Sequence, residues 1–148
     1  MSLSYTTYET KRTWDRGVLV REVRERVTRE VTAPSHWSCY GSKGNYALKK
    51  KAERLIAKVE KIVAEKDVWE QRKAIKAALV SFIASWERMG SSATYRDEGI
   101  SDTAVRECVG SFHDKIVAAT YGGGHCDYDE WKRHHDEAYR RVSKSRGY

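Results

Sequence analysis

Apolar residues recur mainly at spacings of three, four or seven positions through two consecutive segments, and this spacing constrains the fold more than any other feature. In the first segment, roughly 46–65, the repeating residues are Leu48, Ala52, Leu55, Val59 and Ile62. In the second, roughly 68–89, they are Val68, Ile75, Leu79, Phe82, Ile83 and Trp86. A period of 3.6 residues places each set on one face of a helix. The sequence therefore predicts two amphipathic helices, each with one buried face.

Residues that begin helices are found at suitable places around these segments. Asn45 is a candidate N-cap for the first helix, and Asp67-x-x-Glu70 resembles a capping box that restarts the chain as the second. Trp69 and Val80 lie outside the main apolar face of the second helix. They form either a second buried face or part of a surface for a protein partner.

Two further helices are expected after a polar stretch at 91–100. The first runs from Ser101 or Asp102 to about Thr120 and ends at the glycines 122–124, and the second opens at Asp127. Their predicted core faces are Val105, Cys108, Val109, Phe112, Ile116 and Ala119 in the first, and Trp131, His135, Ala138 and Val142 in the second.

The sequence of residues 4–32 is compatible with two kinds of secondary structure, a strand and a helix. The segment YTTYETKRTW is rich in threonine and aromatic residues, which favours a strand, and Asp15-Arg16-Gly17 supplies a turn. The valines after the turn fit a second strand, but they also share one face of a helix with Glu–Arg pairs four residues apart. We favour a long β-hairpin, because the valines are β-branched and a strand-like segment precedes the turn. Such a ribbon is marginal alone, so it should pack on the helices, pair with another chain or lie along a ligand.

These elements predict an α+β fold, in which an N-terminal β-hairpin is followed by a four-helix, mainly α-helical domain. We expect a single domain over 1–148, with a hairpin arm at 1–33, a helical bundle at 46–142 and a frayed tail at 143–148. No stretch approaches the roughly 20 apolar residues of a membrane span, and residues 1–12 lack the apolar core of a signal peptide. The three cysteines are too few for a disulfide framework. We therefore expect a cytoplasmic protein with reduced thiols and no membrane partner.

The positive charge of the chain is concentrated in its middle. The whole chain has 28 basic and 21 acidic side chains, which gives a net charge of +7. Residues 43–89 contain 12 of the basic and 6 of the acidic side chains. Cations on one helix face repel one another, and an anionic partner such as a phosphate backbone removes that cost. The alternative is that this face is only solvated and binds nothing. A solvated face usually mixes both signs of charge, whereas Glu53 and Glu60 are expected on the opposite flank of the helix. The cations that share an arc of about 100° on the first predicted helix are Lys50, Lys51, Arg54, Lys58 and Lys61.

The loop before this helix combines aromatic rings with cations. Its candidate nucleic-acid contacts, beside His36, are Trp37, Tyr40, Lys43 and Tyr46. Unpaired bases stack on such rings for roughly 1–3 kcal/mol each. Alternatively, Trp37 folds inward and fills the junction between the hairpin and the helices, which we favour for this residue.

Metal binding and catalysis have weaker sequence signals. The pairs His36-x-x-Cys39 and His125-Cys126 offer four ligands that suit zinc. Adjacent His125 and Cys126 cannot easily face one ion, however, and no CxxC or HxxxH pair is present. Cys126 with a histidine at 113, 134 or 135 could act in nucleophilic catalysis, yet nothing in the sequence fixes their geometry. We therefore expect no catalytic residue, metal or cofactor.

Three functional hypotheses follow in order. The first is a non-enzymatic, basic protein that contacts the backbone of nucleic acid with weak sequence preference. The second is a small protein-interaction module, which docks on an acidic protein surface or forms homo-oligomers through the hairpin. The third is a small metal- or cysteine-dependent enzyme.

Overall fold

In the part of the chain that the structure describes, an N-terminal hairpin is followed by four helices, which confirms the predicted α+β fold. The structure is a computed structural model that describes residues 3–34, 37, 42–91 and 105–145, with only the backbone given at 42–44, 89–91 and 145. A π-helical turn, η2 (Arg106–Gly110), leads directly into the third helix. The other elements are β1 (Ser4–Asp15), β2 (Val18–Glu30), α1 (Ser42–Glu65), α2 (Val68–Ser91), α4 (Ser111–Ala119) and α5 (Tyr128–Ser145).

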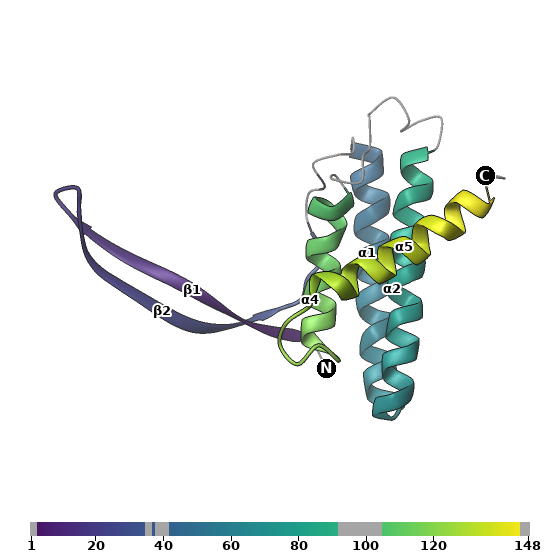
Figure 1. Cartoon of the computed structure of the whole chain (residues 1–148), viewed down its shortest axis with the longest axis horizontal. Helices are drawn as coiled ribbons and strands as arrows, with labels where there is room; N and C mark the ends of the chain where they lie inside the picture. The colour runs from purple at the N-terminus through teal and green to yellow at the C-terminus, as the bar shows by residue number, and fades with distance from the viewer. Residues whose placement is uncertain (1–2, 35–36, 38–41, 92–104, 146–148) are drawn as a thin grey trace.

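The hairpin is a long antiparallel arm that projects away from the helices (Figure 1). Arg16 and Gly17 form its turn with φ angles of 51° and 80°, and two positive φ angles give a turn whose twist matches that of the strands. Leu3 and Val31, at the base of the arm, are buried in the core, whereas every residue from Thr10 to Glu22 is exposed. The alternative of a helix after the turn is wrong, because β1 pairs with β2 along its whole length.

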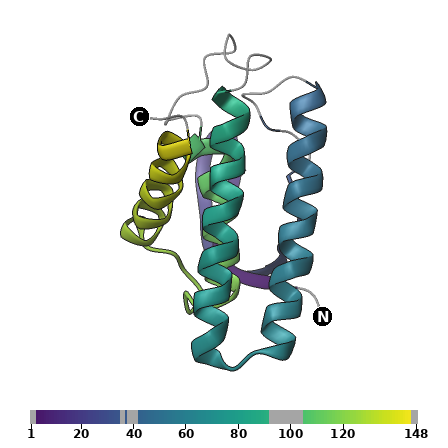
Figure 2. The same cartoon turned by 90° about the vertical axis from the view of Figure 1, so that its right-hand side faces the viewer.

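The first two helices run antiparallel and lie side by side (Figure 2). The predicted apolar face of α1 is buried throughout. The predicted face of α2 is buried except at Val68, which is exposed in the first turn. Val80 is buried and Trp69 is exposed, so the two residues do not form a second buried face.

The connection between α1 and α2 is fixed by side-chain hydrogen bonds. The Asp67 carboxylate accepts a hydrogen bond from the backbone N–H of Glu70 at 3.0 Å, so Asp67 caps α2 as predicted. The side-chain amide of Gln71 donates to the carbonyls of Lys66 and Val63 at 2.6 and 3.2 Å. The bond to Val63 satisfies a carbonyl that the last turn of α1 leaves without a helical partner, and the bond to Lys66 holds the residue that follows this helix.

Trp37 is the centre of the aromatic part of the core. It is 1 % exposed, and its ring centroid lies 4.9 Å from that of Trp86 and 6.3 Å from that of Phe112. The predicted N-cap at Asn45 is wrong, because α1 begins three residues earlier, at Ser42. The Asn45 side-chain oxygen instead accepts a hydrogen bond from the backbone N–H of Trp37, which fixes this residue against the helices.

The last helix, α5, runs obliquely across the other helices and packs mainly on α2 (Figure 1). Its buried face contains His134, not His135 as predicted. His135 is half-buried at the edge of this face, and its Nε2 lies 3.1 Å from a carboxylate oxygen of Glu87. The predicted start of the third helix at Ser101 or Asp102 lies outside the described residues. No helix in the described part of the chain combines the length and the apolar character needed to cross a membrane.

Candidate functional site

The basic side chains of α1 border a groove between α1 and α2. Lys51, Arg54 and Lys58 line the groove from α1, and Ser81 and Ser85 line it from α2. Spacings of three and four residues on each helix bring these polar groups to the same side. The groove has a volume of about 240 Å³, and its remaining lining is apolar, from Leu55, Ala78 and Phe82.

The predicted cations of this surface differ in their ion pairing. The Lys50 ammonium lies 3.7 Å from a carboxylate oxygen of Glu53, although the sequence placed Glu53 on the opposite flank. The two are adjacent because three residues of a helix turn through about 300°, which leaves them about 60° apart. This exposed pair contributes at most about 1 kcal/mol. Among the described residues, the other four cations make no ion pair: Lys51, Arg54, Lys58 and Lys61.

Of the candidate nucleic-acid contacts around the start of α1, the structure describes the side chains of Trp37 and Tyr46. The prediction that Trp37 stacks on bases is wrong, because its ring is buried among other aromatic rings and the favoured inward alternative holds. Tyr46 is exposed, with the Lys50 ammonium 5.6 Å from its ring centroid. Tyr40 and the side chain of Lys43 lie outside the described part of the structure.

The hairpin arm neutralises part of its own charge across the strands. Arg24 lies over the ring of Tyr8, with 4.8 Å from the guanidinium carbon to the ring centroid. Arg21 and Arg26 make no ion pair with any residue that the structure describes. The ion pairs between the strands join Lys11 with Glu25, Arg12 with Glu22, and Arg29 with Glu9.

A second polar cluster, which the sequence did not assemble, is buried between α4 and α5. His113 Nδ1 lies 3.0 Å from Asp114 Oδ1, and His113 Nε2 lies 2.7 Å from His134 Nδ1. His134 Nε2 lies 3.2 Å from Glu130 Oε1. Both imidazoles are buried. These four residues form one continuous chain of polar contacts, which we call the histidine chain.

The two carboxylates that end the histidine chain are held by further donors. Arg106 donates to Asp114 Oδ2 at 3.0 Å. The Tyr121 hydroxyl donates to Glu130 Oε1 at 3.0 Å, and Arg133 pairs with the other oxygen of Glu130. Each carboxylate is therefore fixed in position independently of the histidines.

Burial and hydrogen bonding act in opposite directions on the carboxyl groups of the histidine chain. Burial raises the pKa of Asp114 and of Glu130, but hydrogen bonds from neighbouring side chains outweigh it and lower both pKa values. Burial, together with the neighbouring His113, lowers the pKa of His134 to about 4. At neutral pH both carboxylates are therefore ionised and His134 is neutral.

The loop after α4 carries Cys126 back to this helix. Gly123 and Gly124 have φ angles of 63° and 103°, which favour glycine. Gly122 is packed so closely that a Cβ atom there would lie 2.2 Å from the carbonyl oxygen of His125. The loop can therefore turn this tightly only with glycine at these positions.

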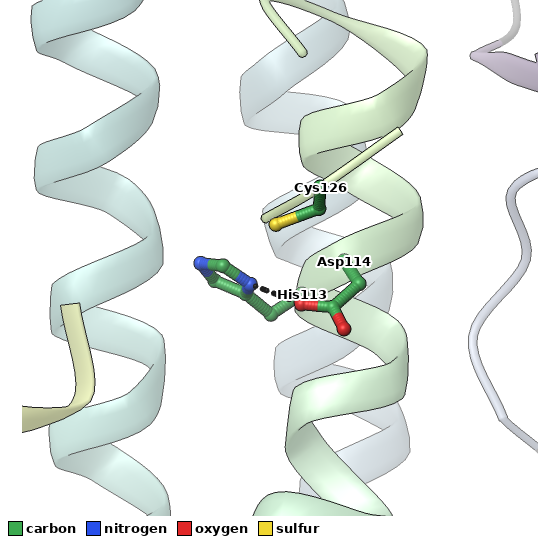
Figure 3. A group of neighbouring side chains, drawn as sticks. All are labelled: His113, Asp114 and Cys126. Carbon is green, nitrogen blue, oxygen red and sulfur yellow. Dashed lines mark hydrogen bonds and ion pairs between the residues drawn. The ribbon is translucent and has the colours of Figure 1, made fainter. Parts of the chain in front are cut away.

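Cys126 lies at the Asp114 end of the histidine chain (Figure 3). One possible ligand atom from each of His113, Asp114 and Cys126 lies within 4.8 Å of those of the other two. Burial and the nearby Asp114 carboxylate raise the pKa of Cys126 to about 12, so the thiol is protonated at neutral pH without a bound cation. Asp114 and Cys126 also line a pocket of about 510 Å³ at the base of the arm, together with Tyr5, Thr7, Arg106 and Lys115.

The sequence contained a partial signal for this cluster. His134 lies three residues after Trp131 and four before Ala138, so it fits the apolar face of α5 as well as His135 does. The approach of Cys126 had no signal, because it depends on the path of the glycine loop. Comparison with known proteins gives no assignment, since no family model, curated protein or solved structure matches the chain.

Proposed function

We propose that the protein binds the phosphate backbone of nucleic acid through the basic groove between α1 and α2. The observation that carries this proposal is the set of four cations on one flank of α1 that have no ion pair among the described residues. Their mutual repulsion is a cost in the free protein that an anionic polymer removes. The proposal includes the expected cytoplasmic location and assigns no catalytic role.

The dimensions of this surface suit a run of phosphates. Ten residues separate Lys51 from Lys61, which corresponds to about 15 Å along the helix axis. Duplex DNA carries one charge per roughly 1.7 Å of its axis, so this length faces several phosphates. The Ser81 hydroxyl adds a short donor of the kind that contacts phosphate oxygens, whereas the Ser85 hydroxyl already donates to the Ser81 carbonyl at 3.0 Å. Because these groups read no base edges, we expect weak sequence preference.

A salt titration tests the proposed function. Four neutralised phosphates predict a slope of about −3.6 on duplex DNA, and about −2.8 on a single strand, for the logarithm of affinity against the logarithm of salt concentration. On the duplex this is a loss of about 100-fold between 50 and 200 mM salt. The measurement is fluorescence anisotropy with a mixed-sequence DNA duplex and with a single-stranded RNA of the same length. Absence of binding at 50 mM salt, or an affinity that salt does not change, would contradict the proposal.

A second candidate function is self-association through the tip of the hairpin arm. Trp14, Val18 and Val20 are about 60 % exposed there, and Leu19 is 39 % exposed. Exposed apolar side chains at the end of a projecting element are typical of interaction sites. A two-stranded ribbon also has two edges of unpaired backbone groups, which a second copy of the ribbon can extend.

For this second candidate, we expect the mass measured by light scattering to rise toward that of a dimer as protein concentration increases. Replacing Trp14 and Leu19 with serine removes apolar surface from the tip and should return the mass to that of one chain. Replacing Arg12 and Lys11 with serine, farther from the tip, is the control and should leave the mass of the dimer unchanged. A single-chain mass at every concentration would exclude self-association.

A further inference from the structure

We propose that His113, Asp114 and Cys126 form a zinc site, in which His134 and Glu130 orient the imidazole of His113. The site is separate from the basic groove and does not depend on nucleic-acid binding. It is argued from the hydrogen-bonding capacity of the histidine chain, from the position of Cys126 and from the pocket beside it.

The histidine chain has fewer hydrogens than contacts. It contains three close contacts, at 3.0, 2.7 and 3.2 Å, and each needs one hydrogen or another positive centre between its two acceptors. Two neutral imidazoles supply one N–H each, and ionised carboxylates supply none. One contact is therefore left with two facing lone pairs. A single additional cation, either a proton or a metal ion, completes the chain.

The side chains around each end of the chain indicate where this cation binds. Both ends already have donors, Arg106 at the Asp114 end, and Tyr121 and Arg133 at the Glu130 end. At the Asp114 end, the sulfur of Cys126 lies beside the contact between His113 and Asp114. The sulfur, the His113 imidazole and the Asp114 carboxylate offer three ligand atoms within 4.8 Å of one another, which a metal ion can bind together. The sulfur therefore favours a metal ion at the His113–Asp114 end.

The types of ligand atom select zinc. A thiolate and an imidazole suit zinc, while magnesium and calcium prefer oxygen ligands alone. One thiolate and one carboxylate balance the double positive charge of the ion. Typical zinc–ligand distances of 2.0–2.3 Å place tetrahedral ligand atoms about 3.3–3.8 Å apart, so ligand atoms within 4.8 Å reach the ion by small side-chain rotations.

The remaining contacts of the histidine chain then fit a metal-bound imidazole. When the ion binds His113 Nδ1, the Nε2–H of His113 donates to His134 Nδ1, and the Nε2–H of His134 donates to Glu130. All three contacts are satisfied by two neutral imidazoles and one ion. Histidine ligands of metals commonly donate their other N–H to a fixed acceptor in this way.

The pocket at the base of the arm gives the ion a position for a further ligand. Asp114 and Cys126 line this pocket of about 510 Å³, and Arg106 and Lys115 line it as well. Three protein ligands leave one position of a tetrahedral ion open to water or another small ligand. The two cations beside it favour a small anion in that position.

Cobalt substitution tests this site in the full-length protein. Wild-type protein treated with a chelator should bind one zinc ion per chain in a calorimetric titration with zinc chloride. The cobalt(II) form should show the thiolate-to-cobalt charge-transfer absorption of a sulfur ligand. Failure to bind zinc at micromolar concentration, or a cobalt form without this absorption, would overturn the proposal without any variant having to fold.

Matched variants then assign the ligands. Cys126→Ser and Asp114→Asn should each lower zinc affinity at least about 100-fold, because loss of a mere supporting partner already costs 10–100-fold. His134→Phe, which removes such a partner, should lower it about 10–100-fold. Retention of wild-type affinity by Cys126→Ser or by Asp114→Asn would overturn the proposal. Far-UV circular dichroism checks that each variant is folded.

Three control variants test competing ligand sets. His125→Gln changes the exposed neighbour of Cys126, and Cys108→Ser and Cys39→Ser change the other two thiols. All three should retain the zinc affinity and the cobalt spectrum of the wild-type protein. Loss of either property in one of these variants would place the ion elsewhere and overturn this assignment.

Discussion

Replacing Lys51, Arg54 and Lys58 with glutamate is expected to lower the affinity for duplex DNA at least about 100-fold, because most backbone contacts become repulsive. The salt slope should fall toward about −0.9, the value for the one contact that Lys61 retains. The three side chains lie on the groove wall and make no ion pair among the residues that the structure describes. Anisotropy titrations at 50–200 mM salt measure both effects.

A control with the same change in net charge separates the groove from general electrostatics. The triple replacement removes six units of positive charge, from +7 to +1. Glutamate at Lys73, Lys132 and Arg140 removes the same charge from exposed positions outside the groove. This control should lose only the weaker, long-range part of the attraction. Equal losses in the two variants would show that the groove is not the binding surface.

Replacing Trp86 with alanine is expected to lower the free energy of unfolding by about 3–5 kcal/mol, as is usual for a large buried aromatic residue. Trp86 is fully buried, and its ring lies against that of Trp37. The cavity would open where α2 meets the segment before α1, so little of the lost contact can be recovered. Urea unfolding followed by far-UV circular dichroism measures the change.

Trp69 is a matched control for Trp86, since both are on α2. Trp69 is 84 % exposed, and its replacement with alanine should change the free energy of unfolding by no more than about 0.5 kcal/mol. If the two variants lost similar stability, the packing of α2 described above would be wrong.

Local patterns in the sequence were sufficient for most of the secondary structure. The apolar period of α1 and the Asp67 cap of α2 are confirmed, because both depend on residues within a few positions of one another. The turn at Arg16 and Gly17 is also local, and it led to the correct hairpin. The N-cap at Asn45 failed because its side chain is used by a residue eight positions away.

Of the two candidate sites, one could be predicted from local sequence patterns and the other depends on tertiary packing. The basic stripe of α1 was visible in the sequence because helical geometry alone sets which side chains share a flank. The burial of Trp37 and the choice of His134 over His135 required the packing of separate helices. These two outcomes removed one predicted nucleic-acid contact and revealed the histidine chain.

The sequence by itself determined the elements of this protein and the positive flank of α1, because helical and strand periods act over a few residues. Only the tertiary structure decided which polar groups meet in the interior. The contact of His113 with His134 spans 21 positions, and the approach of Cys126 depends on a tight glycine loop. Such contacts depend on how helices pack and loops close. A local period of the sequence therefore does not predict which distant residues come into contact.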